Sequence, residues 1–183
     1  MLDLNFNPFP TIETERLILR QLDIADAADL YVVRTHPIVL RYTNMAVHQN
    51  AADTEAFIEQ ILANEANGKA IMWAIALKSD PDLIIGTICY WNIEPENDKA
   101  EIGYILHPDH HRKGLMNEAL ARVITYGFDT MKLHSIIADL DPANIATVKL
   151  LEKNGFTLET HFEKNFLRDD ELEDTAVYIL KIK

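Results

Sequence analysis

The stretch GYILHPDHHRKGLMNEAL, residues 103–120, decides how the rest of the sequence is interpreted. Its apolar first part predicts a strand, and apolar residues at helical spacing resume after Gly114. Free N–H groups and the positive dipole at a helix start bind phosphate oxygens, Gly114 lets a ligand approach the chain closely, and Arg112 and Lys113 add positive charge. The pattern therefore predicts an anion site that fits a pyrophosphate, with an ordinary basic helix entry as the alternative.

Three apolar segments predict an antiparallel meander that leads into this loop. They are KAIMWAIALK (69–78), DLIIGTICYWNI (82–93) and KAEIGYILHP (99–108), separated by short turns rich in Pro, Asp and Asn. Before them, TERLILRQL (14–22) alternates as a half-buried strand does. Helices are expected from Asp23 to His36 and from Asp53 to Asn67, where Asn67-Gly68 provides the stop.

After the loop, the pattern predicts a helix over 114–129, the strand HSIIADL (134–140), a helix from Asn144 to Gly155, and strands over 156–162 and 175–182. The expected fold class is α+β, with a mixed, mostly antiparallel sheet of six to seven strands and about four helices on its two faces. A chain of 183 residues suits a single domain over 1–183, with residues 1–10 as a tail.

Composition narrows the function classes. Hydrophobic residues make up 48% of the chain and charged residues 25%, as in an ordinary globular protein. No apolar run reaches the roughly 18 residues that span a bilayer, so no membrane association is expected. The net charge of −12 disfavours direct nucleic acid binding and suits cationic partners. A lone cysteine, Cys89, fits a reducing, cytoplasmic location.

Three motifs carry a resemblance to a known family. HHRKGLM (110–116) resembles the acyl-CoA signature Q/R-x-x-G-x-G/A of the GNAT superfamily of N-acetyltransferases. TERLILRQLDIADAADL (14–30) is similar to the opening of its RimJ/RimL-like subgroup, the ribosomal-protein N-terminal acetyltransferases, and DPANIATVKLLEKNGF (141–156) resembles that subgroup's N-x-x-S element followed by G-F. His111 and Met116 depart from the signature, and Thr147 stands where the subgroup has Ser.

The resemblance implies a sheet that splays open at an acetyl-CoA cleft and a set of cofactor residues. In such a site the loop amides hold the pyrophosphate and the pantetheine arm adds to the strand that ends at Leu106. Asn144 would reach the pantetheine from the other side, although capping a helix is its alternative role, and both can coexist. The implied cofactor-binding residues are Ile105, Leu106, His111, Arg112, Lys113, Gly114, Leu115, Met116, Asn117 and Asn144.

The same resemblance implies direct attack of an amine on the thioester. Glu101 matches the position of the family's general base, often acting through water, and its alternative role is a solvated edge carboxylate. Backbone amides near Leu106 are natural donors to the oxyanion. Thr147 is the local hydroxyl that could protonate the thiolate, because no Tyr lies between Asn144 and Gly155. It could instead bond helical backbone, and water could supply the proton.

The favoured function is acetyl-CoA-dependent transfer to a primary amine, above all the N-terminal α-amine of a protein. Acetylation of a small-molecule amine, such as a polyamine or antibiotic, and a non-catalytic acyl-CoA-binding module are the alternatives. No metal is expected, because His107, His110 and His111 lack a second ligand cluster. Cys89 is expected to pack in a strand rather than carry an acyl group. The acceptor and the oligomeric state, a homodimer included, stay open.

Overall fold

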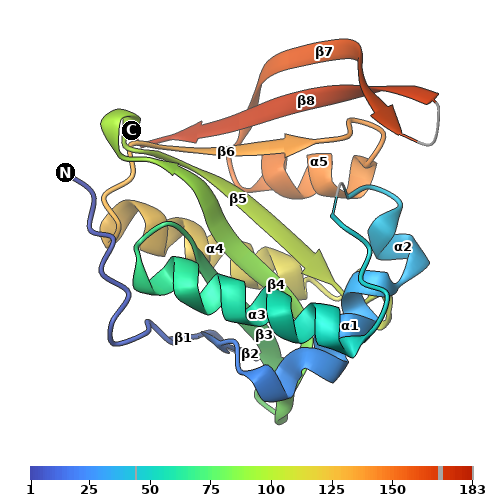
Figure 1. Ribbon diagram of the computed structural model, residues 1–183. Helices are drawn as coiled ribbons and strands as arrows, with labels where there is room; N and C mark the ends of the chain where they lie inside the picture. Colours follow the sequence, from blue (N-terminus) through green and yellow to red (C-terminus); the bar gives the residue numbers. More distant parts are fainter. Residues whose placement is uncertain (44, 169–170, 183) are drawn as a thin grey trace.

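One mixed β-sheet with helices on both faces forms the protein in a computed structural model, which describes residues 1–43, 45–168 and 171–182 (Figure 1). The strands of the described ranges are β1 (Ile12–Glu13), β2 (Leu17–Gln21), β3 (Ile71–Leu77), β4 (Asp80–Glu94), β5 (Lys99–Leu106), β6 (Ser135–Leu140), β7 (Thr157–Arg168) and β8 (Glu171–Lys181). Their order in the sheet is β1-β2-β3-β4-β5-β6-β8-β7. The α-helices there are α1 (Ala27–Thr35), α2 (Pro37–Leu40), α3 (Ala51–Ala66), α4 (Leu115–Asp129) and α5 (Ile145–Lys153).

The expected α+β class is confirmed, including the antiparallel meander of β3, β4 and β5. The described part of the chain has eight strands rather than six or seven, and five α-helices rather than about four. Very short elements account for the difference, since β1 has two residues and α2 has four. Helix α3 begins earlier than expected because Asn50, not Asp53, is its cap and accepts the Asp53 amide at 3.2 Å.

Successive residues of β3 supply two hydrophobic cores, one on each face of the sheet. Ile71, Trp73 and Ile75 point to the core that contains α4 and α5. Met72 and Ala74 point to the core that contains α1 and α3. Because strand side chains alternate between faces, a strand with helices on both sides must be apolar throughout, and β3 is buried along nearly its whole length.

The first ten residues, expected to form a tail, lie against the α4 side of the core. Phe6 is only 6% exposed and belongs to that core. Trp73 donates its indole N–H to the carbonyl of Pro10 at 2.7 Å, and Phe9 packs edge-on against the same ring. None of the helices in the described ranges has the length and apolar character needed to cross a membrane.

The sheet splays between β5 and β6, as expected. These strands are parallel partners only from Lys99 to Glu101 and then diverge, whereas β5 stays paired with β4 as far as Leu106 (Figure 1). Just beyond β5, the backbone amide of His107 donates to the carbonyl of Ile85 on β4 at 2.8 Å. Because backbone groups of an antiparallel strand alternate in direction, the Leu106 amide faces the opening beside β6.

Candidate active site

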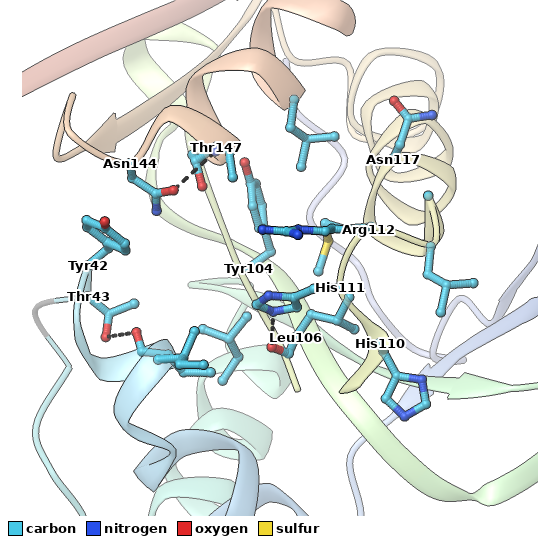
Figure 2. A pocket seen from close by; sticks show the side chains of 18 residues that line it. Tyr42, Thr43, Tyr104, Leu106, His110, His111, Arg112, Asn117, Asn144 and Thr147 are labelled. Atoms are coloured by element: carbon cyan, nitrogen blue, oxygen red, sulfur yellow. Dashed lines mark hydrogen bonds between the residues drawn. The ribbon is translucent and has the colours of Figure 1, made fainter. Parts of the chain in front are cut away.

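Two cavities meet at the splayed end of β5. The loop cavity, of about 550 Å³, lies between the β5–α4 loop, α2 and α5 (Figure 2). The acidic cavity, of about 640 Å³, extends from the same point over the α1 and α3 side of the sheet. Six residues line both cavities: Tyr42, Thr43, Tyr104, Ile105, Asn144 and Thr147. The two cavities therefore meet at these six residues.

The implied cofactor residues gather around the loop cavity. Nine of the ten line it, and Lys113 is the exception. Leu115 and Met116 are buried and contribute their first-turn backbone rather than polar side chains. The Oδ1 atom of Asn117 accepts a hydrogen bond from Asn154 at 3.1 Å, which ties the first turn of α4 to the end of α5.

The loop itself has the backbone form of an anion site. Gly114 is the N-cap of α4 with φ +76°, and Arg112 also has positive φ, +59°. Left-handed residues within a tight loop can turn neighbouring N–H groups toward one concave side, and the first amides of a helix have no carbonyl partner within it. A Cβ atom at Gly114 would meet only the Arg16 guanidinium, at 3.5 Å. The glycine is therefore required by its φ angle more than by crowding.

An ion-pair clamp that the sequence analysis missed holds this loop in place. Arg16 donates from Nε to Glu118 on α4 at 2.7 Å and from Nη1 to the Lys113 carbonyl at 2.9 Å. The Arg16 amide and the Thr14 hydroxyl also donate to Glu118. Burial opposes ionisation of Glu118, but the bonds from Thr14 and Arg16 outweigh it and lower the pKa of this carboxyl. The T-E-R-L opening and the phosphate-type loop are thus one structural unit.

His111 fixes the end of β5. Its Nε2 atom lies 2.8 Å from the carbonyl oxygen of Leu106 (Figure 2). A carbonyl oxygen can only accept, so Nε2 carries the proton. His111 thereby occupies the Leu106 carbonyl and leaves the Leu106 amide as the outward donor. The amide of Ile105 faces β4 instead, so of the two β5 residues among the implied cofactor-binding residues, Ile105 and Leu106, only Leu106 offers its N–H to the cleft.

Three polar side chains lie where the cavities join. Asn144 caps α5 through Oδ1, which accepts the Thr147 amide at 3.2 Å, and the residue also lines both cavities. The Thr147 hydroxyl is directed toward the phenol of Tyr104 (Figure 2). That phenol is buried, and its oxygen has no hydrogen-bond partner among the described residues. Burial raises the pKa of Tyr104, and the nearby Thr147 only partly offsets this, so the phenol keeps its proton at neutral pH.

Glu101 lies in the acidic cavity, on the face of β5 opposite Tyr104. A bulge in β4 puts Asn92 in the left-handed region, φ +44°, and its amide donates to Glu101 at 2.9 Å. Burial raises the pKa of Glu101, the Asn92 bond partly offsets this, and the charge of Asp139 raises it further. Burial likewise raises the pKa of Asp139. The raised pKa values bring both carboxyls closer to the range of a working base.

From the sequence, Tyr104 is indicated only as an aromatic residue that could line an acceptor cleft or pack in the core, and Asp139 is missed, for a common reason. Both sit within apolar strand segments, where an isolated polar residue carries no signal of the gap beside it. The divergence of β5 from β6 turns both strands into cavity walls. Only the pairing of these two strands, which are far apart in sequence, reveals the gap between them.

The residues of the rival hypotheses have other contacts. His111 bonds Leu106, and the rings of His107 and His110 pack edge-on with centroids 6.4 Å apart. Within residues 1–43, 45–168 and 171–182, no cluster of three or more His, Cys, Asp or Glu is placed to hold a metal. Burial raises the pKa of Cys89 to about 12, so this thiol stays protonated at neutral pH.

Comparison with known proteins identifies the family. Residues 16–157 match the family model described as "Acetyltransferase (GNAT) domain". The chain belongs to the GNAT acetyltransferase family. It is an acetyl-CoA-dependent N-acetyltransferase, and residues of the HHRKGLM segment (110–116), which resembles the family's acyl-CoA signature, line the loop cavity.

Curated relatives span most of the chain. The uncharacterized N-acetyltransferase p20 of Bacillus licheniformis is 35% identical over 81% of this chain and 83% of its own length. The uncharacterized N-acetyltransferase YoaA of Bacillus subtilis is 32% identical over 93% and 96%. The ribosomal-protein-serine acetyltransferase of Escherichia coli is 28% identical over 71% of each chain.

Solved structures share the fold. A GNAT-family acetyltransferase from Bacillus anthracis superposes with a TM-score of 0.81 at 27% identity, covering 94% of this chain and 98% of its own. RimL, a ribosomal L7/L12 α-N-protein acetyltransferase in complex with coenzyme A, superposes with a TM-score of 0.86 at 20% identity, covering 94% and 98%. A ribosomal-protein acetyltransferase is thus among the sequence relatives of this chain, and RimL shares its fold.

Proposed function

We propose that this acetyltransferase modifies the N-terminal α-amine of a protein. The observation that carries the proposal is the junction of the two cavities at Tyr104, Ile105, Asn144 and Thr147. An acyl donor in the loop cavity and an amine in the acidic cavity would meet only there. The E. coli relative that acts on a ribosomal protein supports this acceptor class.

The loop cavity fits acetyl-CoA by the chemistry of its donors. The αL glycine at the start of α4 and the nearby positive-φ Arg112 suit a diphosphate, and the edge of β5 beyond Glu101, which has no β6 partner, leaves room for an extended, amide-bearing arm. Bound acetyl-CoA supplies an activated acetyl thioester. Every other part of the reaction falls to residues of this chain.

Glu101 is proposed as the base that takes the proton of the acceptor ammonium, directly or through one water. Its half-buried carboxylate and raised pKa favour proton uptake, and the Asn92 amide holds it in orientation. Asp139 is the neighbouring carboxylate, and its charge helps to hold the cationic amine in the cavity before deprotonation. The neutral amine then attacks the thioester carbon as the C–S bond breaks.

Two further tasks belong to the junction. The Leu106 amide is the proposed donor to the oxygen that gains negative charge, because it faces the opening and has no β6 partner. The departing sulfur needs a proton, and the hydroxyls of Tyr104 and Thr147 are both at the junction. We assign the donation to this hydroxyl pair, with Tyr104 added to the Thr147 that the sequence indicated. The second proton that the nitrogen loses on becoming an amide then restores the hydroxyl, while the first stays on Glu101 until it passes to water.

The negative charge of the acidic cavity favours an acceptor amine that arrives as a cation. Five carboxylates line it: Glu101, Asp139, Asp141, Glu173 and Asp174. A peptide α-amine has a pKa near 8, whereas a lysine amine has a pKa near 10.4 and is only about 0.1% neutral at physiological pH. One base of modest strength therefore suffices for the α-amine but serves lysine poorly.

The test is an amine panel assayed for thiol release that depends on acetyl-CoA. It comprises peptides with free N-termini, the same peptides with blocked N-termini and an internal lysine, spermidine, and an aminoglycoside. The proposal expects the free N-terminal peptides to have the highest kcat/KM and the blocked peptides to have almost none. A clear preference for spermidine or the aminoglycoside would instead establish the small-molecule alternative.

A further inference from the structure

Arg34 on α1 carries a buried charge that nothing in the described chain balances. The residue is 7% exposed. Its buried Nε atom has no hydrogen-bond partner, and within the described ranges the guanidinium forms no ion pair with a carboxylate. Burying an ion without a partner is costly, so such a group usually has a ligand or a functional reason.

The surroundings of Arg34 orient the guanidinium without neutralising it. It lies over the ring of Phe57 on α3 at 4.1 Å from the centroid, a cation–π contact that holds the plane of the fork. Burial lowers the pKa of Arg34 to about 10, which leaves it charged at neutral pH. Its charge in turn adds to the effect of burial in lowering the pKa of His48.

Arg34 lines the same acidic cavity as Glu101. Cys89 of β4 lines this cavity as well, and its cross-strand neighbour there is Gly103 of β5. Opposite Cys89, Gly103 has no side chain, and a Cβ there would contact the Cys89 sulfur at 3.4 Å. The cavity is thus lined by the carboxylates of Glu101 and Asp139 where β5 and β6 diverge, and by the cation of Arg34 on α1.

We propose that Arg34 is a subsite for a carboxylate of the acceptor, so that the preferred substrate is an N-terminus with Asp or Glu within its first two residues. This inference rests on the proposed function, because it places the α-amine at Glu101. A planar guanidinium forms paired, charge-assisted hydrogen bonds with a carboxylate, which matches a guanidinium whose buried Nε has no partner among the described residues. The carboxylates of the acidic cavity would repel polyanions. A single carboxylate next to a cationic amine is therefore the charge pattern that fits both Arg34 and Glu101.

The kinetic test uses peptides that differ only in charge. N-terminal Glu is compared with Gln at the first residue, and the same pair is then compared at the second residue. For the parent, we expect kcat/KM to favour the Glu peptide at one of these positions by about tenfold to hundredfold, the range of a charged hydrogen-bonded contact. In Arg34→Met, which keeps the length of the stem, this ratio should fall to about one while the Gln peptide is little affected.

A binding test separates this inference from the proposed function. Calorimetry with the N-acetyl-Glu and N-acetyl-Gln peptides, in the presence of CoA, needs no turnover. Tighter binding of the Glu product by the parent, lost in Arg34→Met and partly kept in Arg34→Lys, supports the subsite even if the amine panel fails. Equal binding of both products, or a Glu preference that survives in Arg34→Met, overturns it. Thermal unfolding checks that each variant is folded, and Arg34→Met should be no less stable than the parent because it removes an unpaired buried charge.

Discussion

Replacing Arg16 by Ala should weaken acetyl-CoA binding even though Arg16 lies outside the loop. The change removes the contact to Glu118 at 2.7 Å and the contact to the Lys113 carbonyl at 2.9 Å. The ion pair is discounted to about 0.2–1 kcal/mol, because the Arg16 side chain is 45% exposed. The carbonyl contact adds about 0.5–1.5 kcal/mol. A loss of about 1–2 kcal/mol from the binding-competent loop corresponds to roughly 5- to 30-fold weaker binding.

Calorimetric titration of acetyl-CoA measures this effect, and Lys78→Ala provides the matched control. Lys78, whose side chain is 38% exposed, forms an ion pair with Glu13 at 3.0 Å that does not involve the loop. The control should keep parental affinity. If Arg16→Ala also binds acetyl-CoA with parental affinity while remaining folded, the clamp does not shape the site and the reasoning fails.

Three further outcomes are expected. Gly114→Val should weaken acetyl-CoA binding by about ten- to hundredfold, because a β-branched residue is strained at φ +76°. Gly114→Asn should bind closer to the parent, because Asn tolerates this region of φ. Equal affinities of the two variants in calorimetry would refute this prediction. Asn144→Asp keeps the α5 cap but loses the amide donor, so melting temperature should hold while affinity falls by about fivefold; parental affinity would reduce Asn144 to a cap. Cys89→Ala should turn over normally, and native Cys89 should resist iodoacetamide at neutral pH, because its pKa of about 12 leaves almost no thiolate; rapid alkylation or loss of activity would contradict this.

Local patterns in the sequence were sufficient to predict most of the fold. The meander, the α4 stripe and the Asn144 cap depend on contacts close in sequence, and all three are present. The N-terminal ten residues, expected to form a tail, lie against the core because Phe6 is buried in it and Phe9 packs against Trp73, and no local period reveals these contacts. Short elements such as β1 exist only through pairing with a neighbour.

The candidate site likewise has features that follow from local sequence and features that depend on long-range contacts. Most of the implied cofactor residues belong to one continuous motif, and nine of the ten line the loop cavity. The Arg16 clamp joins residues that are 102 positions apart, and the burial of Arg34 depends on the packing of α1 against α3. Such long-range polar contacts have no signature in composition or period, because each partner alone resembles a surface charge.

The most direct test of the account is a pH series of kcat/KM for the parent and Glu101→Gln, with an N-terminal peptide as acceptor. The variant keeps the hydrogen-bonding shape of the side chain but cannot take a proton, so turnover at neutral pH should fall by about 10²- to 10⁴-fold while acetyl-CoA affinity is unchanged. Because the pKa of Glu101 is raised, parental activity should climb as pH rises through that value. The gap should narrow above the pKa of the amine, near 8, where the acceptor arrives neutral. Parallel curves less than about threefold apart would contradict the account, because a positioned base contributes far more than that.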